Sequence, residues 1–246
     1  MSALNSGWLV DEVVSRSLWA FQGVGQPDGI AYGHRSVADR MLVGWAAPSD
    51  ALGAEAALGP VDARRVDAFT PERRRSFLTG RAVLGRLLGE LVPGSAAWTV
   101  DTAVREGSAS DHGPVAVRGV PALASIAHTS GLVVVAVAAT NRAIRLGVDV
   151  EADRPDPERS ASLTRMLQAP DATALRRWTE VQAVLKASGH GLRVEPAQVR
   201  FGPGSARIEG TSSTYRVAHV DGPPGFLVSL AWHPASARSG SKWTAR

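Results

Sequence analysis

The stretch at residues 147–151 constrains the fold most, because an apolar strand pattern there carries two acids in alternate positions. Side chains alternate across a strand, so Asp149 and Glu151 are expected to point to the same face. Taken alone, the stretch is also what a strand ending in solvated acids looks like. The element that covers this face therefore decides what the acids do.

A second stretch, at residues 178–191, has a helical pattern and ends at glycines. Gln182 and Lys186 are four residues apart in it, so they share one face of the helix. Lysine occurs only at positions 186 and 242 of a chain that otherwise uses arginine, which favours a task for a compact ammonium at 186, with chance as the alternative. Two acids that face this lysine can hold a divalent cation and a phosphate together, because Mg²⁺ takes carboxylates and phosphate oxygens as ligands.

The charge balance favours an anionic partner, since the net charge is +4 and the pI is about 10.3. Aromatic residues are few and do not interleave with the arginines, so we expect no nucleic-acid partner. No apolar run approaches the ~20 residues of a membrane helix, and the N-terminus lacks the pattern of a signal peptide. The absence of cysteine excludes disulfides and thiolate metal sites. We expect a cytoplasmic monomer without membrane contact.

The apolar patterns along the chain predict an α+β protein of one or two domains. Strands are expected at residues 41–46, 98–104, 115–118, 124–127, 132–139 and 145–151, and helices at 71–91, 160–167 and 172–189. Pro71 opens the longest of these helices, since proline is tolerated in a first turn. Four short patterns between residues 199 and 232 predict an antiparallel meander with glycine turns.

Five short motifs follow one another in an order that is more specific than any one of them alone. They are Phe-Leu-Thr-Gly-Arg at 77–81, His-Gly-Pro at 112–114, Ser-Ile-Ala-His-Thr-Ser-Gly at 125–131, Gly-Val-Asp-Val-Glu at 147–151, and a helix at 178–192 that carries Trp178, Thr179, Ala183, Lys186, Gly189, Gly191 and Leu192. Over about residues 41–234 the chain resembles the 4'-phosphopantetheinyl transferase family. Its members move phosphopantetheine from coenzyme A to a serine of a carrier protein.

The resemblance implies a fold of two related α/β halves with a pseudo-twofold axis, and a site at their interface. It divides the chain into a loosely ordered N-terminal extension at 1–40, an N-terminal half at 41–123, a C-terminal half with the metal and coenzyme A motifs at 124–234, and a basic tail at 235–246. The implied substrates are coenzyme A and an acyl or peptidyl carrier protein, and the implied cofactor is Mg²⁺.

The resemblance assigns the chemistry to four residues. Asp149 and Glu151 match acids that bind Mg²⁺, which in turn holds the pyrophosphate of coenzyme A. Lys186 matches a residue that faces the phosphates and protonates the leaving group, and a surface lysine lying along its helix is the plain alternative. Gln182 stands where the family has a glutamate that ligates the metal and takes the proton of the carrier serine.

Four further side chains match contacts to coenzyme A. Arg81 matches a phosphate contact, and arginine binds phosphate through two hydrogen bonds. Arg73 is a second candidate in a looser register, and a solvated helix face is the alternative for both arginines. His128 matches a contact to the 3'-phosphate, whereas a lone histidine is more often structural. His112 lies in a turn that matches one near the adenine, with a plain Gly-Pro loop as the alternative.

Three departures from the family bear on the reaction. Gln182 brings no charge to a cation and takes no proton near neutral pH, so the base would be water or Glu151. Ala127 stands where the family has a hydroxyl. Residues 151 and 178 are 27 positions apart, which shortens the segment that helps to dock the carrier protein in the family.

The sequence leaves three functions open. The first is phosphopantetheinyl transfer, in which a protein works mainly by positioning phosphates and stabilising charge. The second keeps the fold and replaces the reaction, as in a tailoring enzyme of a natural-product pathway that uses the same site without transfer. The third is a non-catalytic binder of coenzyme A or of a carrier protein. Since fold does not fix function, the geometry of the site has to separate them.

Overall fold

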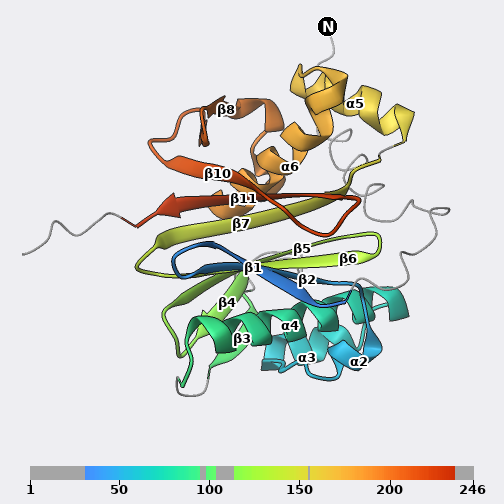
Figure 1. The fold of residues 1–246 in the computed structure, drawn as a ribbon, viewed down its shortest axis with the longest axis vertical. Coiled ribbons are helices and arrows are strands. Elements are labelled where there is room, and N and C mark those ends of the chain that lie inside the picture. The colour runs from blue at the N-terminus through green and yellow to red at the C-terminus, as the bar shows by residue number, and fades with distance from the viewer. Residues whose placement is uncertain (1–30, 95–97, 104–113, 155, 236–246) are drawn as a thin grey trace, which may run out of the picture.

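Two antiparallel sheets lie face to face between two groups of helices (Figure 1). The computed structural model describes residues 31–94, 98–103, 114–154 and 156–235. Helices occur together with antiparallel sheets, which confirms the expected α+β class. The helices are α2 (Asp50–Gly53), α3 (Pro60–Val66), α4 (Pro71–Leu91), α5 (Pro157–Leu167) and α6 (Asp171–Ser188), with short 3₁₀ turns at Gly191–Arg193 and Pro196–Gln198.

Within the described residues the strands form three sheets. The first has the order β1 (Gly33–Ala38), β2 (Met41–Ala46), β6 (Leu132–Ala139) and β5 (Ala122–Thr129). The second has the order β7 (Ala143–Ala152), β11 (Phe226–Pro234), β10 (Thr214–Val220), β9 (Ser205–Ile208) and β8 (Val199–Gly202). The third is the hairpin of β3 (Thr99–Thr102) and β4 (Val115–Arg118). The expected C-terminal meander is confirmed as the run from β8 to β11.

Within the described residues the helices and strands expected from the apolar patterns are present, with ends that shift by a few residues. A short helix that the pattern also indicates at residues 8–21 lies outside the described residues. The patterns miss α2 and α3, because helices of four and seven residues are too short to show a helical period. They also miss β1, whose side chains are mostly exposed, so that it has no apolar alternation. The loosely ordered extension expected at 1–40 is therefore corrected: residues 33–38 form an edge strand paired with β2. Residues 1–30 and 236–246 lie outside the described part.

Strand β6 is the centre of the fold because both of its faces are covered. All eight of its residues are buried. Its odd-numbered valines belong to the core that contains the leucines of α4. Its even-numbered residues belong to the core shared with β7 and β11 of the second sheet. A strand covered on both faces reads as a continuous apolar run rather than an alternating one, which is the pattern seen here.

Strand β7 alternates instead, because its two faces meet different surroundings. Val148 and Val150 belong to the core between the two sheets. Asp149 and Glu151 therefore point to the opposite face, which α6 covers. The backbone N–H of Val148 donates to Ser125 Oγ at 3.1 Å, which ties β7 to β5 of the first sheet.

The chain passes from the first sheet to the second between Ala139 and Ala143. The boundary expected at residues 123/124 lies inside β5, and the expected division into halves stays a prediction. Strands β5 and β6 form a hairpin, and β6 pairs with β2 along its length. The hairpin therefore completes the sheet that covers α4 and does not begin the second sheet.

Helix α6 lies directly on β7 at Gly147. A Cβ atom there would lie 2.1 Å from the carbonyl oxygen of Ala183 and 2.4 Å from the backbone nitrogen of Ala187. Glycine in a strand permits such a close approach of another backbone, and a side chain does not. Helix α6 ends at Gly189, whose φ of +73° is the left-handed conformation common at helix ends. The contact at Gly147 thus fixes how far the side chains of α6 are from β7.

The change Gly147→Ala should destabilise the protein by about 3 kcal/mol or more, because the backbone of α6 has to move to admit the methyl group. Gly89→Ala in α4 is the matched control, since a Cβ there meets nothing within 4 Å. That change should stabilise the protein by about 0.5–1 kcal/mol through helix propensity. Urea unfolding followed by tryptophan fluorescence measures both, and an unchanged midpoint for Gly147→Ala would contradict the close packing of α6 on β7.

Candidate functional site

The two acids of β7 lie beneath α6 and are largely removed from water. Asp149 is 7% exposed and Glu151 is 9% exposed. In the register of the second sheet, Asp149 lies opposite Ser229 of β11. Buried carboxylates need partners, because an isolated charge is costly to remove from water. The partners of these acids come from α6 and α5.

Helix α6 directs one row of side chains toward the acids. Trp178, Gln182 and Lys186 are spaced four residues apart and so lie along one side of the helix. The first and last of them contact the acids, Trp178 through its indole N–H and Lys186 through its ammonium group. The structure thus brings together the two stretches from which the site was inferred.

Lys186 pairs with Asp149 at the more open end of the site. Its Nζ lies 2.7 Å from Asp149 Oδ1 and also donates to the backbone carbonyl of Val148 at 3.1 Å. The lysine side chain is 33% exposed and the aspartate side chain 11%. Because an ammonium group has three donors, Lys186 retains the capacity to bind an anion from solvent while it holds Asp149.

Glu151 is held by two donors on one oxygen. The indole Nε1 of Trp178 donates to its Oε1 at 3.0 Å. Arg159 donates to the same oxygen from Nη2 at 2.5 Å. Arg159 comes from the first turn of α5 and was not among the residues expected at the site. Each acid of β7 therefore has a cation of the chain as its partner.

Burial raises the pKa of both acids above its ordinary value. For Asp149 the effect of burial outweighs the ammonium of Lys186, which lowers the pKa. For Glu151 burial is again the largest cause, the guanidinium of Arg159 lowers the pKa, and the charge of Asp149 raises it. Each cation works against burial, so removing either one would raise the pKa of its acid further.

Gln182 lies between Trp178 and Lys186 on the same side of α6 but differs from them in its hydrogen bonding. Its Nε2 is buried and has no hydrogen-bond partner among the residues that the structure describes. An unsatisfied buried donor costs about 1–3 kcal/mol. The amide therefore adds no charge to the site, and its Nε2 adds no satisfied contact, in the place where the resemblance expects a glutamate.

The donor set does not fit a resident divalent cation as it stands. Asp149 and Glu151 are each already paired with a cation of the chain, and Gln182 adds no third charge. Among the described residues, no group of three or more His, Cys, Asp or Glu is arranged to hold a metal ion. Mg²⁺ requires near-octahedral oxygen ligands and dehydrates reluctantly. The Mg²⁺ expected from the resemblance stays a prediction.

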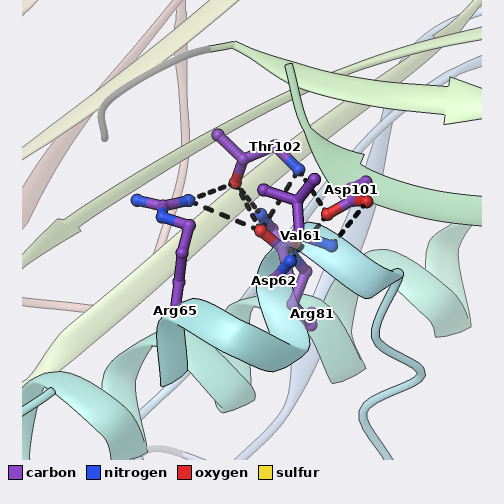
Figure 2. A network of polar contacts seen from close by, with 6 residues as sticks. All are labelled: Val61, Asp62, Arg65, Arg81, Asp101 and Thr102. Carbon is purple, nitrogen blue, oxygen red and sulfur yellow. Dashed lines mark hydrogen bonds and ion pairs between the residues drawn. The ribbon is translucent and has the colours of Figure 1, made fainter. Parts of the chain in front are cut away.

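Arg81 lies in a separate buried network and not on an open surface (Figure 2). Its Nε donates to Asp62 Oδ2 at 2.7 Å, and its Nη2 donates to Thr102 Oγ1 at 3.1 Å. Asp62 is fully buried and also accepts from the backbone N–H of Thr102 and from Arg65. Asp101 of β3 caps α3 beside them through the backbone N–H of Val61 and Asp62.

This network gives Arg81 partners within the fold, and its contact with a coenzyme A phosphate stays a prediction. Arg81 is 5% exposed, and its guanidinium joins α4 to α3 and β3. The helical pattern places Arg81 correctly on α4 but does not reveal that Asp62 and Thr102 converge on the same point. A buried aspartate requires such a partner, which explains the arginine without a ligand.

The remaining expected contacts lie elsewhere. Arg73, in the first turn of α4, stacks its guanidinium over the ring of Phe69 at 4.1 Å from the ring centre. His128 is exposed near the end of β5, opposite Val133 of β6. His112 lies outside the described residues. The roles of Arg73 and His128 as ligand contacts stay predictions.

A second row of hydrogen-bonded polar side chains, which the sequence did not predict, lies under a different side of α6. Glu180 is two residues from Gln182 and so points to another side of the helix. It lies 2.9 Å from His219 Nε2, and His219 Nδ1 lies 3.3 Å from Ser229 Oγ. Ser229 Oγ is 2.7 Å from Thr179 Oγ1 and is fully buried. Because no substrate reaches a fully buried hydroxyl, this serine, histidine and glutamate tie α6 to β10 and β11.

Arg159 is the residue at the acid pair that sequence reasoning missed, although one signal was present. Asp156 and Pro157 mark the start of a helix, which puts Arg159 in its first turn. A cation is unfavourable there because the N-terminal end of a helix carries partial positive charge. An arginine in that place indicates an acidic partner, but spacing alone does not identify Glu151 as that partner.

Comparison with protein-family models and with curated proteins finds no match for this chain. Within the described residues, no helix has the length and apolar character needed to span a membrane. An assignment of function therefore depends on the side chains of the site itself.

The change Arg81→Ala should destabilise the protein by about 3–5 kcal/mol, because the buried carboxylate of Asp62 loses its closest counter-ion. Arg75→Ala is the matched control on the same helix. It removes a pair with Asp50 in which the side chains are 36% and 78% exposed, and it should change stability by less than about 1 kcal/mol. Urea unfolding compares the two. Equally small losses would contradict a structural role for Arg81.

The raised pKa values of Asp149 and Glu151 predict a pH dependence of stability. A group whose pKa is higher in the folded state keeps its proton longer there as the pH rises. Its contribution is present below the ordinary pKa values of 3.8 and 4.5 and is lost as the pH rises through the raised values. The double variant Asp149→Asn/Glu151→Gln cannot titrate there. As the pH rises above about 4.5, its free energy of unfolding should therefore increase relative to that of the wild type. Urea unfolding across this pH range measures the difference, and a constant difference would contradict it.

Proposed function

We propose that this chain transfers 4'-phosphopantetheine from coenzyme A to a serine of an acyl or peptidyl carrier protein, at the site between β7 and α6. The proposal includes the two-halved fold of the 4'-phosphopantetheinyl transferases. The observation that carries it is the contact of Lys186 with Asp149 at 2.7 Å and of Trp178 with Glu151 at 3.0 Å. These contacts join the strand motif and the helix motif of the resemblance in one site.

Lys186 is the residue best placed to act on a phosphate. It is one-third exposed, so its ammonium meets both Asp149 and the solvent. In the proposed reaction the carrier serine oxygen forms a bond to the phosphorus of the pantetheine phosphate while the pyrophosphate P–O bond breaks. Lys186 stabilises the leaving phosphate and delivers its proton, which is electrostatic catalysis rather than covalent chemistry.

The proton of the carrier serine needs an acceptor other than Gln182. An amide takes no proton near neutral pH, whereas a carboxylate with a raised pKa is a better base than an ordinary one. Glu151 and Asp149 are the carboxylates of the site, and burial raises the pKa of both. We assign this role to Glu151, because Asp149 is committed to Lys186. Glu151 can accept the proton only when its ion pair with Arg159 opens.

Two observations favour a second candidate function, which is binding of coenzyme A or a carrier-tethered intermediate without transfer. The first is that Gln182 carries no charge and leaves its Nε2 unsatisfied. The second is that both acids are paired within the chain. A site with these features retains Lys186 for an anion but lacks the third acid. A repurposed tailoring enzyme and a non-catalytic binder both fit this description.

A carrier protein fits the charge of the chain. Carrier proteins are expected to be acidic, and this chain has a net charge of +4 with a pI of about 10.3. The short segment between β7 and α6 consists mainly of α5, whose residues Ser160 and Thr164 bond to Asp171 at the start of α6. We propose that α5 is the surface which meets the carrier, since it lies next to the site.

Intact-mass measurement of an apo carrier protein with coenzyme A and MgCl₂ tests the proposal. The wild type should add one phosphopantetheine group, and Gln182→Glu should add it faster, because a third carboxylate can take the serine proton. General acid–base catalysis contributes about 10²–10⁴-fold in rate, so Lys186→Ala should slow transfer by at least about 100-fold. Arg75→Ala on α4, which lies outside both the acid site and α5, serves as the control.

The same experiment separates the two functions. Transfer by neither the wild type nor Gln182→Glu, together with binding of coenzyme A by calorimetry, would favour the second candidate. Equal rates for wild type and Gln182→Glu would show that residue 182 does not limit the reaction. Circular dichroism of Lys186→Ala is required as well, because Asp149 loses its partner in that variant.

A further inference from the structure

Arg159 approaches the acid pair from a position that the start of α5 fixes. Asp156 caps the helix by accepting the backbone N–H of Arg159 at 2.8 Å. The guanidinium Nη2 then lies 2.5 Å from Glu151 Oε1, and the two side chains are 19% and 11% exposed. An ion pair this far from water is screened less by salt than one at the surface.

The place of Arg159 on its helix is unfavourable without Glu151. The first turn of a helix repels cations, because its unpaired N–H groups carry partial positive charge. The chain nevertheless has an arginine there, beside Glu158, whereas acids are the usual residues of a first turn. The contact with Glu151 compensates this repulsion, so the pair depends on both members.

The charges at the site already balance without any added ion. Two carboxylates face two cations, Lys186 and Arg159. A divalent cation placed here would be repelled by both cations. It would also find Oε1 of Glu151 already accepting from Arg159 and Trp178. A guanidinium and a divalent cation therefore compete for the same carboxylate.

We propose that Arg159 is a built-in cation at the metal position of the acid pair, and that a divalent metal binds Glu151 only in exchange for it. The exchange is a property of the acid pair and does not depend on phosphopantetheinyl transfer. Metal binding and the ion pair of Arg159 are thus coupled through a single carboxylate, and such coupling is reciprocal.

Binding of Mn²⁺ to the full chain, read from the paramagnetic resonance of the free ion, tests the exchange. Mn²⁺ is a suitable probe because it takes carboxylate ligands as Mg²⁺ does. Arg159→Gln removes the competing charge and should bind Mn²⁺ about tenfold or more tightly than the wild type. Arg159→Lys keeps the charge and should stay within about twofold of the wild type. Arg165→Gln on the same helix, whose guanidinium bonds only to its own helix among the contacts seen, should change nothing.

A second substitution tests whether the additional affinity for Mn²⁺ comes from Glu151. In Arg159→Gln/Glu151→Gln the additional affinity for Mn²⁺ should be lost, because the carboxylate that received the metal is gone. Equal affinities of the wild type and Arg159→Gln would overturn the proposal. A gain that Arg165→Gln shares, or that survives the loss of Glu151, would overturn it as well.

Folding of the variant provides a further test that does not depend on transfer. Arg159→Gln leaves Glu151 without its cation and should lower the thermal unfolding midpoint. Mn²⁺ should then raise this midpoint more in Arg159→Gln than in the wild type. Should the variant fail to fold without metal, the exchange requires Mn²⁺ to restore its circular-dichroism spectrum. A variant that Mn²⁺ neither restores nor stabilises would show that Arg159 only anchors α5.

Discussion

The site depends on how closely α6 approaches β7. Glycine at position 147 lets the backbone of the helix rest on the strand, with space for no Cβ between them. At this separation Lys186 reaches Asp149, and Trp178 reaches Glu151 two turns earlier. A larger residue at 147 would lift the helix and lengthen both contacts at once. Packing and chemistry are therefore set by the same backbone contact.

The protein buries acids in two places and treats them differently. Asp62 accepts from Arg81, from Arg65 and from the backbone and hydroxyl of Thr102, and it is fully enclosed. Its hydrogen-bonding capacity is used within the fold, so it joins α3, α4 and β3 and is closed to ligands. The acids of β7 have fewer donors, and the lysine beside them remains partly open to solvent. The acids of β7 are thus the pair that the fold satisfies less completely, which is why the proposed function is placed there.

Local patterns predicted much of this fold, and contacts between distant segments account for the rest. The alternation of β7 and the four-residue spacing on α6 were enough to predict that Lys186 and the acids face one another. They were not enough for Arg81, because a helical period gives a direction but not the identity of Asp62, which lies on another helix. Arg159 was missed for the same reason, because its partner Glu151 lies on a strand and not on its own helix.

The double burial of β6 has a consequence for how the chain folds. Its eight residues contain no charge, glycine or proline, and β5 pairs with it through a short turn. Its other edge pairs with β2, which is distant in the sequence. Pairing of distant segments is slow because a long loop must close first, so this edge forms its hydrogen bonds late in folding. During that time the strand is an apolar, β-prone segment with an open edge, which is the kind of segment that pairs with other molecules. The feature that stabilises the finished core thus makes refolding at high protein concentration a competition with aggregation.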